Sequence, residues 1–277
     1  MAQDRPQDRP QDRPQDRPSA IQAYLFENGQ TSVLQLAAAI GTSVATLRRD
    51  LTEMEQAGRI ERLHGAARLA TGTLHEVGFK AREATNLAAK RAIALAAFAM
   101  IRPDSTLMLD AGTTVLQLAR QIRLTGLAVR VFTNSLAVAQ ELVDLPSVNL
   151  CVLGGKVRVE NLSITGPLAD AMLQGLWFDQ VFLGISAISD DGWITSHDAD
   201  EARLNASMMA RSAQTIVLAD HSKFGQRATF AVQRLTGEER LVTDRALPAD
   251  LAHYAEAIGL VVTFVSTSGA ERQLAYG

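Results

Sequence analysis

The strongest constraint on the fold lies in the helix predicted from residues 42–51, where apolar and polar side chains divide between two faces. When successive residues are set roughly 100° apart, one face is a continuous apolar stripe. The stripe consists of Val44, Leu47, Leu51 and Met54. The opposite face carries Ala45, Thr46, Arg49, Thr52 and Glu53. Ser43 stands in front of the helix as an N-cap, and Arg48 lies on its flank.

Two shorter helices precede this segment. Ile21 and Leu25 indicate a first helix that ends near Gly29. Ser32 is followed three residues later by glutamine, the spacing of a capping box, and Gly41 ends the second helix. The sequence therefore predicts the order helix, helix, tight turn, helix.

A β-hairpin is predicted directly after the third helix. Ile60 and Leu63 belong to its first strand, the chain turns at His64 and Gly65, and the second strand returns through Leu69. The hairpin and the three helices together have the pattern of a winged helix.

A helix of this size fits the major groove of DNA, where arginine donates two hydrogen bonds to guanine. Arg49 is the candidate for base contact, whereas Arg48 could contact a phosphate or pair with a carboxylate inside the domain. The alternative is an ordinary amphipathic three-helix unit with exposed arginines. Net charge does not decide between them, because residues 41–69 hold five arginines and four acidic residues.

This segment resembles the winged helix of the DeoR family of bacterial repressors over about residues 19–69. The matching residues are Ser43, Thr46-Leu47-Arg48-Arg49-Asp50-Leu51, Gly58 and Arg62-Leu63-His64-Gly65-Ala66. Thr42 departs from the family's usual valine and Ala66 from a second glycine in the wing, and neither change removes a DNA contact. The resemblance implies DNA binding by Ser43, Thr46, Arg48, Arg49, Arg62 and His64.

Length and composition limit the remaining possibilities. A chain of 277 residues is long enough for a small domain and a larger one. The formal net charge of -3 argues against a general polyanion binder and suits a cytoplasmic protein with one local DNA-binding face. Cys151, the single cysteine, excludes an internal disulfide, and its apolar neighbours predict a buried strand position. No signal peptide is visible, and the longest apolar stretch, residues 92–101, is too short to span a membrane.

The N-terminus repeats Gln-Asp-Arg-Pro four times over residues 3–18. Proline keeps the preceding residue out of the helical region and the repeats have nothing to bury, so we expect a disordered tail. Turn-forming residues between 70 and 78 discourage a continuous helix. The predicted organisation is a tail at 1–18, a winged helix-turn-helix domain at 19–70, a linker at 71–85 and an α/β effector-binding domain at 86–277.

Apolar runs alternate with helical stretches from Leu107 onward. The runs are 107–109, 129–132, 148–153, 181–183, 215–219 and 260–264. Such alternation predicts an α/β sheet, largely parallel, with helices on both faces. Ligands of these sheets collect at the carboxyl ends of the strands, where helix N-termini present free amides. Small and hydroxyl-bearing residues with nearby lysines follow several runs, which suits a phosphorylated small molecule but does not define a Walker or Rossmann motif.

The same segments resemble the effector domain of the DeoR family, so the resemblance covers about residues 19–264. The matches are Asp110-Ala111-Gly112-Thr113-Thr114, Thr133-Asn134-Ser135, Gly154-Gly155, Gly166-Pro167, Asp179, Gly184, Glu201 and Asp220-His221-Ser222-Lys223-Phe224-Gly225. The resemblance implies a ribose-5-phosphate-isomerase-like fold and a repressor of a carbohydrate operon that responds to a phosphorylated sugar. The implied effector site is Asp110, Gly112, Thr113, Thr114, Thr133, Asn134, Ser135, Gly154, Gly155, Lys156, Glu201 and Lys223.

Two other functions compete with this hypothesis. In a sugar-phosphate isomerase, Asp110, Glu201 and Lys223 could serve as base, acid and anion anchor. An isomerase needs no DNA-binding domain, so we expect a receptor without catalysis. A protein-interaction module that had lost DNA binding would lack the arginines, and they are present.

We expect no cofactor and no metal ion. A helix capped by Ser196 or Asp198 explains the acidic residues at 198–201, because the helix dipole favours them in its first turn. The expected partners are double-stranded operator DNA, the metabolite and further copies of the chain in a dimer or tetramer, since paired half-sites raise affinity.

Overall fold

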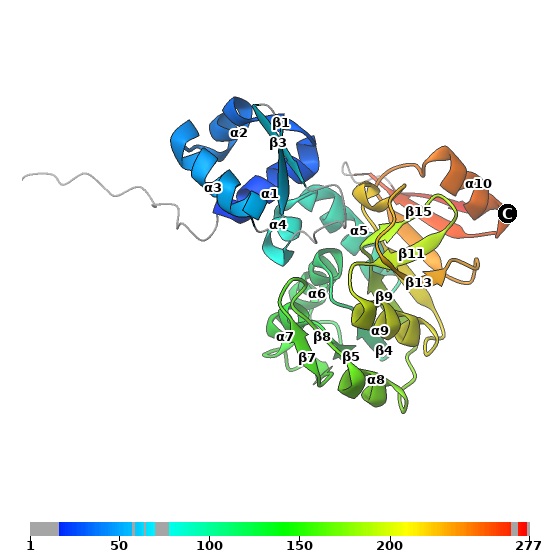
Figure 1. Cartoon of the computed structure of the whole chain (residues 1–277). Helices are drawn as coiled ribbons and strands as arrows, with labels where there is room; N and C mark the ends of the chain where they lie inside the picture. Colours follow the sequence, from blue (N-terminus) through cyan, green and yellow to red (C-terminus); the bar gives the residue numbers. More distant parts are fainter. Residues whose placement is uncertain (1–16, 57–58, 64, 70–77, 267–270, 276–277) are drawn as a thin grey trace, which may run out of the picture. The chain divides into compact units, whose positions relative to one another are not determined.

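The computed structural model describes residues 17–56, 59–63, 65–69, 78–266 and 271–275. The chain divides into two compact units, Met1–Ala81 and Arg82–Gly277, called here the N-terminal and C-terminal units. Both are drawn in Figure 1 with colours that follow the sequence. No helix within the described ranges combines the length and the apolar character that crossing a membrane requires.

Three helices and a small sheet make up the N-terminal unit. The elements are α1 (Arg17–Asn28), β1 (Thr31–Ser32), α2 (Val33–Ile40), α3 (Val44–Gln56), β2 (Ile60–Leu63) and β3 (Ala66–Leu69). Strand β3 lies between β1 and β2 and is antiparallel to both. The predicted three helices and hairpin are therefore confirmed.

Local sequence signals begin and end these helices as predicted. The Ser32 side chain accepts from the Gln35 amide while the Gln35 side chain accepts from the Ser32 amide, which completes the capping box. Gly41 ends α2 in the left-handed region, with φ of 71°. The stripe of α3 enters the core, where Leu47 and Leu51 are fully buried. The other buried core residues are Ile21, Leu25, Val33, Leu36, Ala37, Met54, Ile60 and Ala67.

Two stretches outside the predicted domains are helical. Arg17 and Pro18, at the end of the predicted tail, form the first turn of α1, where proline's missing amide costs no hydrogen bond. Residues 79–84 of the predicted linker form α4 (Phe79–Ala84). Residues 1–16 of the tail and 71–77 of the linker lie outside the described residues.

An eight-stranded sheet forms the centre of the C-terminal unit. Across the sheet the strands are β16 (Glu271–Ala275), β15 (Val261–Val265), β14 (Arg240–Thr243), β12 (Thr215–Leu218), β9 (Gln180–Gly184), β4 (Thr106–Leu109), β5 (Val129–Thr133) and β6 (Val148–Val152). Neighbours are parallel except for β16, which is antiparallel to β15. The predicted, largely parallel α/β sheet is confirmed.

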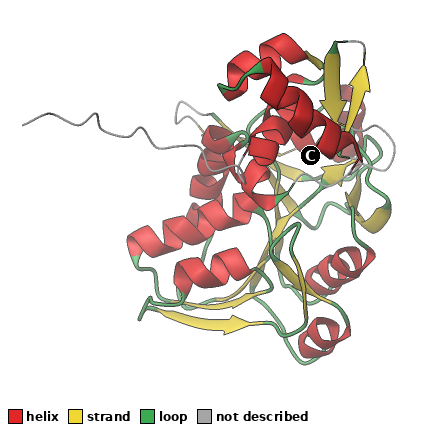
Figure 2. Cartoon of the chain, turned by 60° about the vertical axis from the view of Figure 1, so that its left-hand side comes forward, coloured by secondary structure: helices red, strands yellow, loops and turns green. Residues whose placement is uncertain are grey.

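Helices cover both faces of this sheet (Figure 2). They are α5 (Leu87–Ala99), α6 (Thr113–Thr125), α7 (Leu136–Leu142), α8 (Pro167–Leu173), α9 (Ala199–Met209) and α10 (Ala249–Ala257). Helices α5, α6 and α7 share one core with Leu107 and Leu109 of β4. Helices α8, α9 and α10 share another with Met108, because successive strand side chains point to opposite faces.

The six predicted apolar runs all contain strands of the main sheet. The remaining strands of the C-terminal unit lie outside those runs: β14, β16, β7 (Lys156–Arg158), β8 (Ser163–Thr165), β10 (Ala187–Ile188), β11 (Trp193–Ser196) and β13 (Phe230–Arg234). Cys151 lies in a strand as predicted but is only half-buried, because β6 is the edge of the described sheet.

Candidate functional site

The outer face of α3 presents the two arginines predicted to contact DNA. Arg48 and Arg49 are exposed, and neither guanidinium group makes a hydrogen bond or ion pair with another described residue. Arg48 is therefore not engaged by a carboxylate in the described part of the domain. Ser43 caps the helix by accepting from the Thr46 amide at 3.1 Å, and the two hydroxyls lie 2.8 Å apart. This face offers two guanidinium groups to phosphates or base edges.

The acidic residue next to these arginines is neutralised from α1. Arg17 Nε donates to Asp50 Oδ2 at 2.6 Å, and Arg17 Nη2 donates to Asp50 Oδ1 at 3.1 Å. Such a two-point pair fixes both side chains and cancels their charges locally. The carboxylate of Asp50 therefore repels DNA phosphates less than its position suggests.

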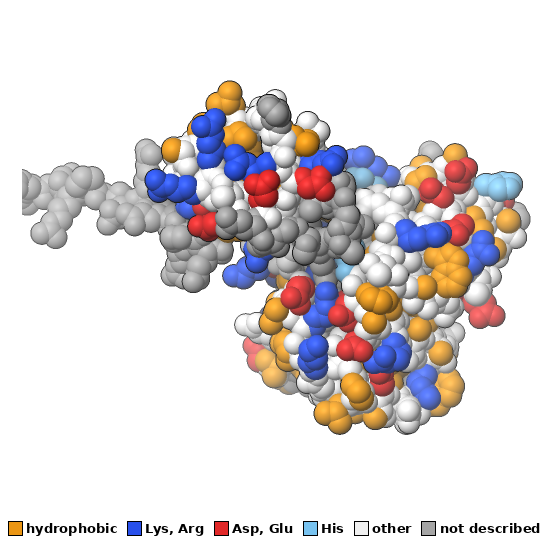
Figure 3. Space-filling view, viewed as in Figure 1, with side chains coloured by type: hydrophobic (Ala, Val, Ile, Leu, Met, Phe, Trp, Pro, Cys, Tyr) orange, Lys and Arg blue, Asp and Glu red, His pale blue; other side chains and the backbone are white. Residues whose placement is uncertain are grey.

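The wing strand β2 lies beside α3. Arg62 Nη1 donates to Thr52 Oγ1 at 3.0 Å and lies 3.8 Å from Glu55 Oε2. These contacts are exposed and worth little in water, so a DNA phosphate can compete for Arg62. On the face of the N-terminal unit in Figure 3, Lys and Arg side chains gather with Asp and Glu among them. His64, also predicted to contact DNA, lies outside the described residues.

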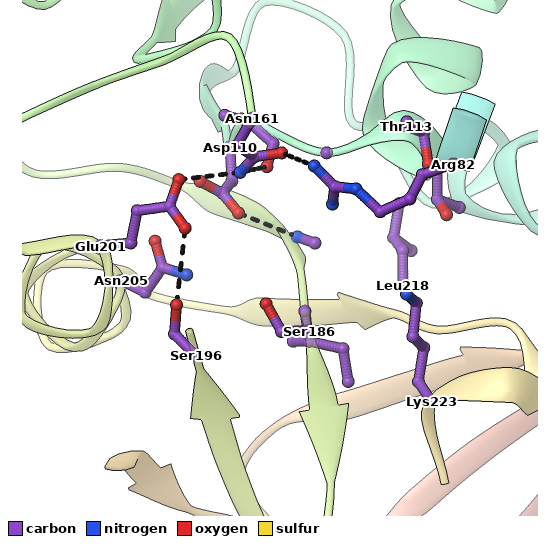
Figure 4. Close-up of a pocket in the computed structure, with 15 residues that line it drawn as sticks. Arg82, Asp110, Thr113, Asn161, Ser186, Ser196, Glu201, Asn205, Leu218 and Lys223 are labelled. Carbon is purple, nitrogen blue, oxygen red and sulfur yellow. Dashed lines mark hydrogen bonds between the residues drawn. The ribbon is translucent and has the colours of Figure 1, made fainter. Parts of the chain in front are cut away.

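A polar pocket lies at the carboxyl ends of β4 and β9 (Figure 4). From β4 the chain adds β5 and β6 on one side and then returns to add β9 on the other, so the strand order reverses here. The two backbones are close: a Cβ on Gly112 would lie 3.3 Å from the Cα of Gly184. The predicted residues that line the pocket are Asp110, Gly112, Thr113, Thr114, Glu201 and Lys223.

One side of the pocket can hold an anion. Helix α6 begins at Thr113, and its N-cap Gly112 makes no side-chain capping bond, so the first amides keep free donors. Arg82 of α4 and Lys223 of the short helix η1 (His221–Lys223) line the same side in Figure 4. Two cations and a helix N-terminus together favour a phosphate group.

The opposite side carries a buried carboxylate, Glu201, whose position is fixed by its neighbours. Its Oε1 accepts from Asn161 Nδ2 at 2.9 Å and from Ser163 Oγ at 2.5 Å, and lies 3.1 Å from Arg158 Nη1. Its Oε2 accepts from Ser196 Oγ at 3.4 Å. The carboxylate is thus held in one orientation at the pocket wall.

Asp110, the second buried carboxyl group, has a strongly shifted pKa. Burial and the negative charge of Glu201 raise the pKa of Asp110 to about 8. The Gly184 amide donates to Asp110 Oδ2 at 3.2 Å and opposes this shift without offsetting it. At neutral pH the group is mostly protonated, so it can donate a hydrogen bond to a ligand oxygen.

Asn205 of α9 brings an unused acceptor to the pocket. Its side chain is only 8% exposed, and Oδ1 has no hydrogen-bond partner among the described residues. A buried acceptor without a partner costs about 1–3 kcal/mol. A ligand hydroxyl would satisfy it.

The acidic cluster at the start of α9 is explained by capping. Asp198 Oδ1 accepts from the amides of Asp200 and Glu201, both at 3.0 Å, so Asp198 rather than Ser196 is the N-cap. Within the described ranges, no group of three or more His, Cys, Asp or Glu side chains is arranged to hold a metal ion.

Three predicted effector residues after β5 have other contacts and do not line the pocket. Thr133 Oγ1 donates to the Leu109 carbonyl at 2.6 Å, and Ser135 caps α7 by accepting from the Val138 amide at 3.2 Å. Asn134 is buried and hydrogen-bonds to Asp110, which lowers the pKa of that carboxyl. These residues support the pocket wall from behind.

The predicted residues after β6 also lie outside the pocket lining. Gly155 has φ of 151°, and a Cβ there would lie 2.5 Å from the Thr165 carbonyl oxygen, so the position requires glycine for packing. The Gly154 amide donates to the sulfur of Met172 at 3.0 Å. Lys156 is exposed in β7, opposite Thr165.

Five polar residues line the pocket that the sequence did not predict: Arg82, Asn161, Ser186, Ser196 and Asn205. Arg82 fell in the expected linker. Asn161 lies between β7 and β8 beside Leu162, whose φ of 51° is unusual but leaves no sequence pattern. Ser196 alone carried a signal, because it ends an apolar stretch directly before the acidic start of α9.

Two family models match the chain. The DeoR-like helix-turn-helix domain matches residues 17–73, and the DeoR C terminal sensor domain matches residues 85–245. The chain is 35% identical over 231 residues to the HTH-type transcriptional regulator GlpR of Haloferax volcanii, covering 83% of this chain and 90% of that protein. It is 33% identical over 225 residues to the HTH-type transcriptional repressor CsqR of Escherichia coli, covering 81% and 85%.

Among solved structures, the chain is similar to ribose 5-phosphate isomerase A from Methanocaldococcus jannaschii, with 16% identity and a TM-score of 0.36. That similarity covers 49% of this chain and 53% of the isomerase. The family models, by contrast, cover both units, in the order in which the structure shows them. The chain therefore belongs to the DeoR family of transcriptional regulators, with a helix-turn-helix domain followed by a C-terminal sensor domain.

Proposed function

We propose that this regulator represses a carbohydrate-utilisation operon by sequence-specific DNA binding and that a phosphorylated sugar controls it. The two-sided pocket carries the proposal. Arg82, Lys223 and the α6 N-terminus suit a phosphate group, while Glu201 and Asn205 on the other side suit hydroxyls (Figure 4). A phosphorylated sugar has both kinds of group in one small molecule.

Control follows from thermodynamic linkage. A sugar phosphate that binds the low-affinity DNA state more tightly must weaken DNA binding by the same factor. We propose this direction, release of DNA on binding, because the related CsqR is named a transcriptional repressor.

The pocket is proposed as a receptor site without turnover. The Glu201 carboxylate is tied to Asn161, Ser163 and Arg158, and Asp110 is protonated at neutral pH, so neither presents a free carboxylate base. The relatives GlpR and CsqR are named as regulators. Isomerisation of phosphosugars by the purified protein would contradict this part of the proposal.

Phosphorylated sugars should raise the melting temperature of the full chain, and Lys223→Ala should strongly reduce that rise. A ligand present at about 100 times its dissociation constant stabilises by about 2.7 kcal/mol, and loss of a charged hydrogen bond removes about 1.5–3 kcal/mol of binding. The measurement is a thermal-shift panel of sugar phosphates with the unphosphorylated sugars alongside. Lys156→Ala, which removes an exposed lysine outside the pocket, is the matched control. Equal responses of the two variants would remove Lys223 from the site.

Arg49→Ala should cost about 1–3 kcal/mol on the specific DNA site and relax sequence preference at one position. Arg48→Ala should instead weaken all duplexes alike and lower the salt dependence by about one counterion. Both arginines are exposed on α3, so neither change disturbs the core. Affinities are measured on a duplex selected by the wild-type protein and on its single-base variants. An Arg49→Ala protein with full affinity and preference would refute the base-contact assignment.

We propose that the chain acts as a dimer or tetramer in the cytoplasm. Helix α3 spans thirteen residues and reads few base pairs, so two copies on paired half-sites are needed for tight binding. Access to the operator requires the compartment that holds the chromosome.

A further inference from the structure

Helix α4 joins the two units of the chain. The boundary between the units falls inside this helix, between Ala81 and Arg82. The residue directly after the boundary, Arg82, lines the proposed sugar-phosphate pocket. The same short helix thus carries a pocket residue and the chain that leads back to the DNA-binding unit.

The side chain of Arg82 connects α4 to the carboxylate side of the pocket. Arg82 Nη2 donates to Asn161 Oδ1 at 2.6 Å and to the Glu160 carbonyl at 3.2 Å. Asn161 Nδ2 in turn donates to Glu201 Oε1 at 2.9 Å and to the Ala111 carbonyl at 3.0 Å. These bonds are drawn in part in Figure 4. An anion that draws Arg82 toward itself competes with Asn161 for the donors of the guanidinium group.

The backbone of α4 is connected to the pocket by a second route. Lys90 of α5 is buried, and its ammonium donates to the carbonyls of Arg82 and Thr85. Its charge and that of Lys223 act on Asp220. Burial alone would raise the pKa of this carboxyl, but the two lysines, together with hydrogen bonds from Ser222 and Asn86, lower the pKa below its ordinary value. Lys223 lines the pocket, so Asp220 is attracted both to a lysine of the pocket and to the lysine that contacts α4.

An anion bound between Arg82 and Lys223 competes with the protein for both cations. It competes with Asn161 for Arg82 and adds negative charge beside Lys223, so Lys223 and Asp220 together attract Lys90 more strongly. The first change acts on the side chain of Arg82 in α4. The second acts, through Lys90, on the carbonyls of Arg82 and Thr85 at the end of α4. If α4 moves as one hydrogen-bonded unit, residues 79–81 move with residue 82.

We infer that α4 is the coupling element between sugar-phosphate binding and DNA binding, with Arg82 acting through its side chain and Lys90 through the carbonyls of Arg82 and Thr85 at the end of α4. The inference rests on the proposed function of the pocket. Lys90 is a positioning residue, since it holds α4 and does not line the pocket.

The test compares Lys90→Met with wild type in the full chain, using inorganic phosphate as the probe and chloride at matched ionic strength as the reference. The coupling factor is the ratio of dissociation constants for a selected DNA duplex with and without phosphate. Phosphate binding itself is measured by calorimetry. We expect Lys90→Met still to bind phosphate while its coupling factor falls toward one, from a wild-type value in the usual range of about 5–150.

Two matched variants separate this effect from a general loss of structure. Lys90→Arg keeps the charge and the donors and should restore coupling, whereas Arg91→Met removes an exposed charge from the next position of α5 and should leave coupling unchanged. If Lys90→Met does not fold, Arg82→Lys provides the same test, because lysine can bind phosphate but cannot reproduce the guanidinium contacts with both Asn161 and Glu160.

The outcomes distinguish the inference from the proposed function. Folded Lys90→Met and Arg82→Lys proteins with wild-type coupling would overturn the inference alone. Phosphate that binds wild type without changing duplex affinity would contradict both the inference and the proposed control of DNA binding. Phosphate binding that is absent, or insensitive to Lys223→Ala, would instead refute the anion site on which the proposed function rests.

Discussion

Replacing Leu47 with alanine is expected to unfold the N-terminal unit while the C-terminal unit stays folded. Leu47 is fully buried in a core of ten buried side chains, all of which belong to the N-terminal unit. A buried Leu→Ala change costs about 2–5 kcal/mol, and small domains have little stability in reserve. The two cores of the C-terminal unit contain no residue of this cluster. DNA binding should therefore be lost almost completely, and the loss of affinity should be larger in Leu47→Ala than in Arg49→Ala.

The measurement is calorimetric unfolding together with a thermal-shift assay with sugar phosphate. In Leu47→Ala the first transition should move to lower temperature or vanish, and the sugar-phosphate response of the second should remain. Leu34→Ala is the matched control, because Leu34 is 72% exposed on α2 and the same truncation leaves no cavity there. A single transition that moves as a whole in Leu47→Ala would contradict independent cores.

The N-terminal unit follows closely from its sequence because its signals are local. The stripe through Leu47, the capping box at Ser32 and the left-handed Gly41 each act within a few residues. The main sheet was predictable for a related reason: strands buried on both faces are continuous apolar runs. Strands such as β7 and β8, three residues each, offer too little pattern to be separated from loops.

The pocket residues after β4 could be predicted from the end of one strand, and Glu201 and Lys223 from the family resemblance. The segment after β4 reaches the pocket because β4 borders the point where the strand order reverses. The polar residues after β5 and β6 resemble it in sequence, yet these strands lie on the side of β4 away from β9. Ser135 therefore caps α7, and the backbone of Gly155 packs closely against the β7–β8 hairpin.

No local sequence pattern marks Arg82 or Asn161 as a pocket residue. Arg82 and Asn161 are separated by 79 positions and meet only because α4 and the β7–β8 hairpin converge at the pocket. Neither occupies a strand end or a helix cap that would mark it. The pocket residues that the sequence did not predict are thus those brought together by tertiary packing, including Arg82, which we assign to coupling.

Asp110→Asn is expected to stabilise the C-terminal unit strongly at and above neutral pH. Because its pKa is raised from the ordinary value of 3.8 to about 8, native Asp110 holds a proton that the unfolded chain has released. Between these values the native state binds more protons, so the free energy of unfolding falls as pH rises, by about 1.4 kcal/mol per pH unit. By pH 7 the free energy of unfolding has fallen by an amount on the order of 4 kcal/mol. The neutral amide removes this loss and can still accept from the Gly184 amide.

Calorimetry of wild type and Asp110→Asn across the window from about pH 4 to about pH 8 tests this sign directly. The free energy of unfolding should fall with pH more steeply in wild type than in the variant, and the difference in slope should correspond to at most one bound proton. Asp191→Asn is the control, because Asp191 is exposed and hydrogen bonds from Ser189 and Arg227 lower its pKa. The contribution of Asp191 to folding stability is therefore lost only in acid. Parallel curves for wild type and Asp110→Asn would show that Asp110 is ionised in the folded protein.

The same ionisation should limit sugar-phosphate binding at high pH. Above pH 8 the deprotonated Asp110 loses its donor and adds a negative charge beside Glu201, which opposes an anionic ligand. Asp110→Asn keeps a donor and stays neutral, so its affinity for a sugar phosphate should persist where that of wild type falls. Titration of both proteins on either side of pH 8 measures the difference. Equal losses of affinity would place the titrating group elsewhere, and would mean that the buried pair of carboxyl groups does not set the charge of the pocket.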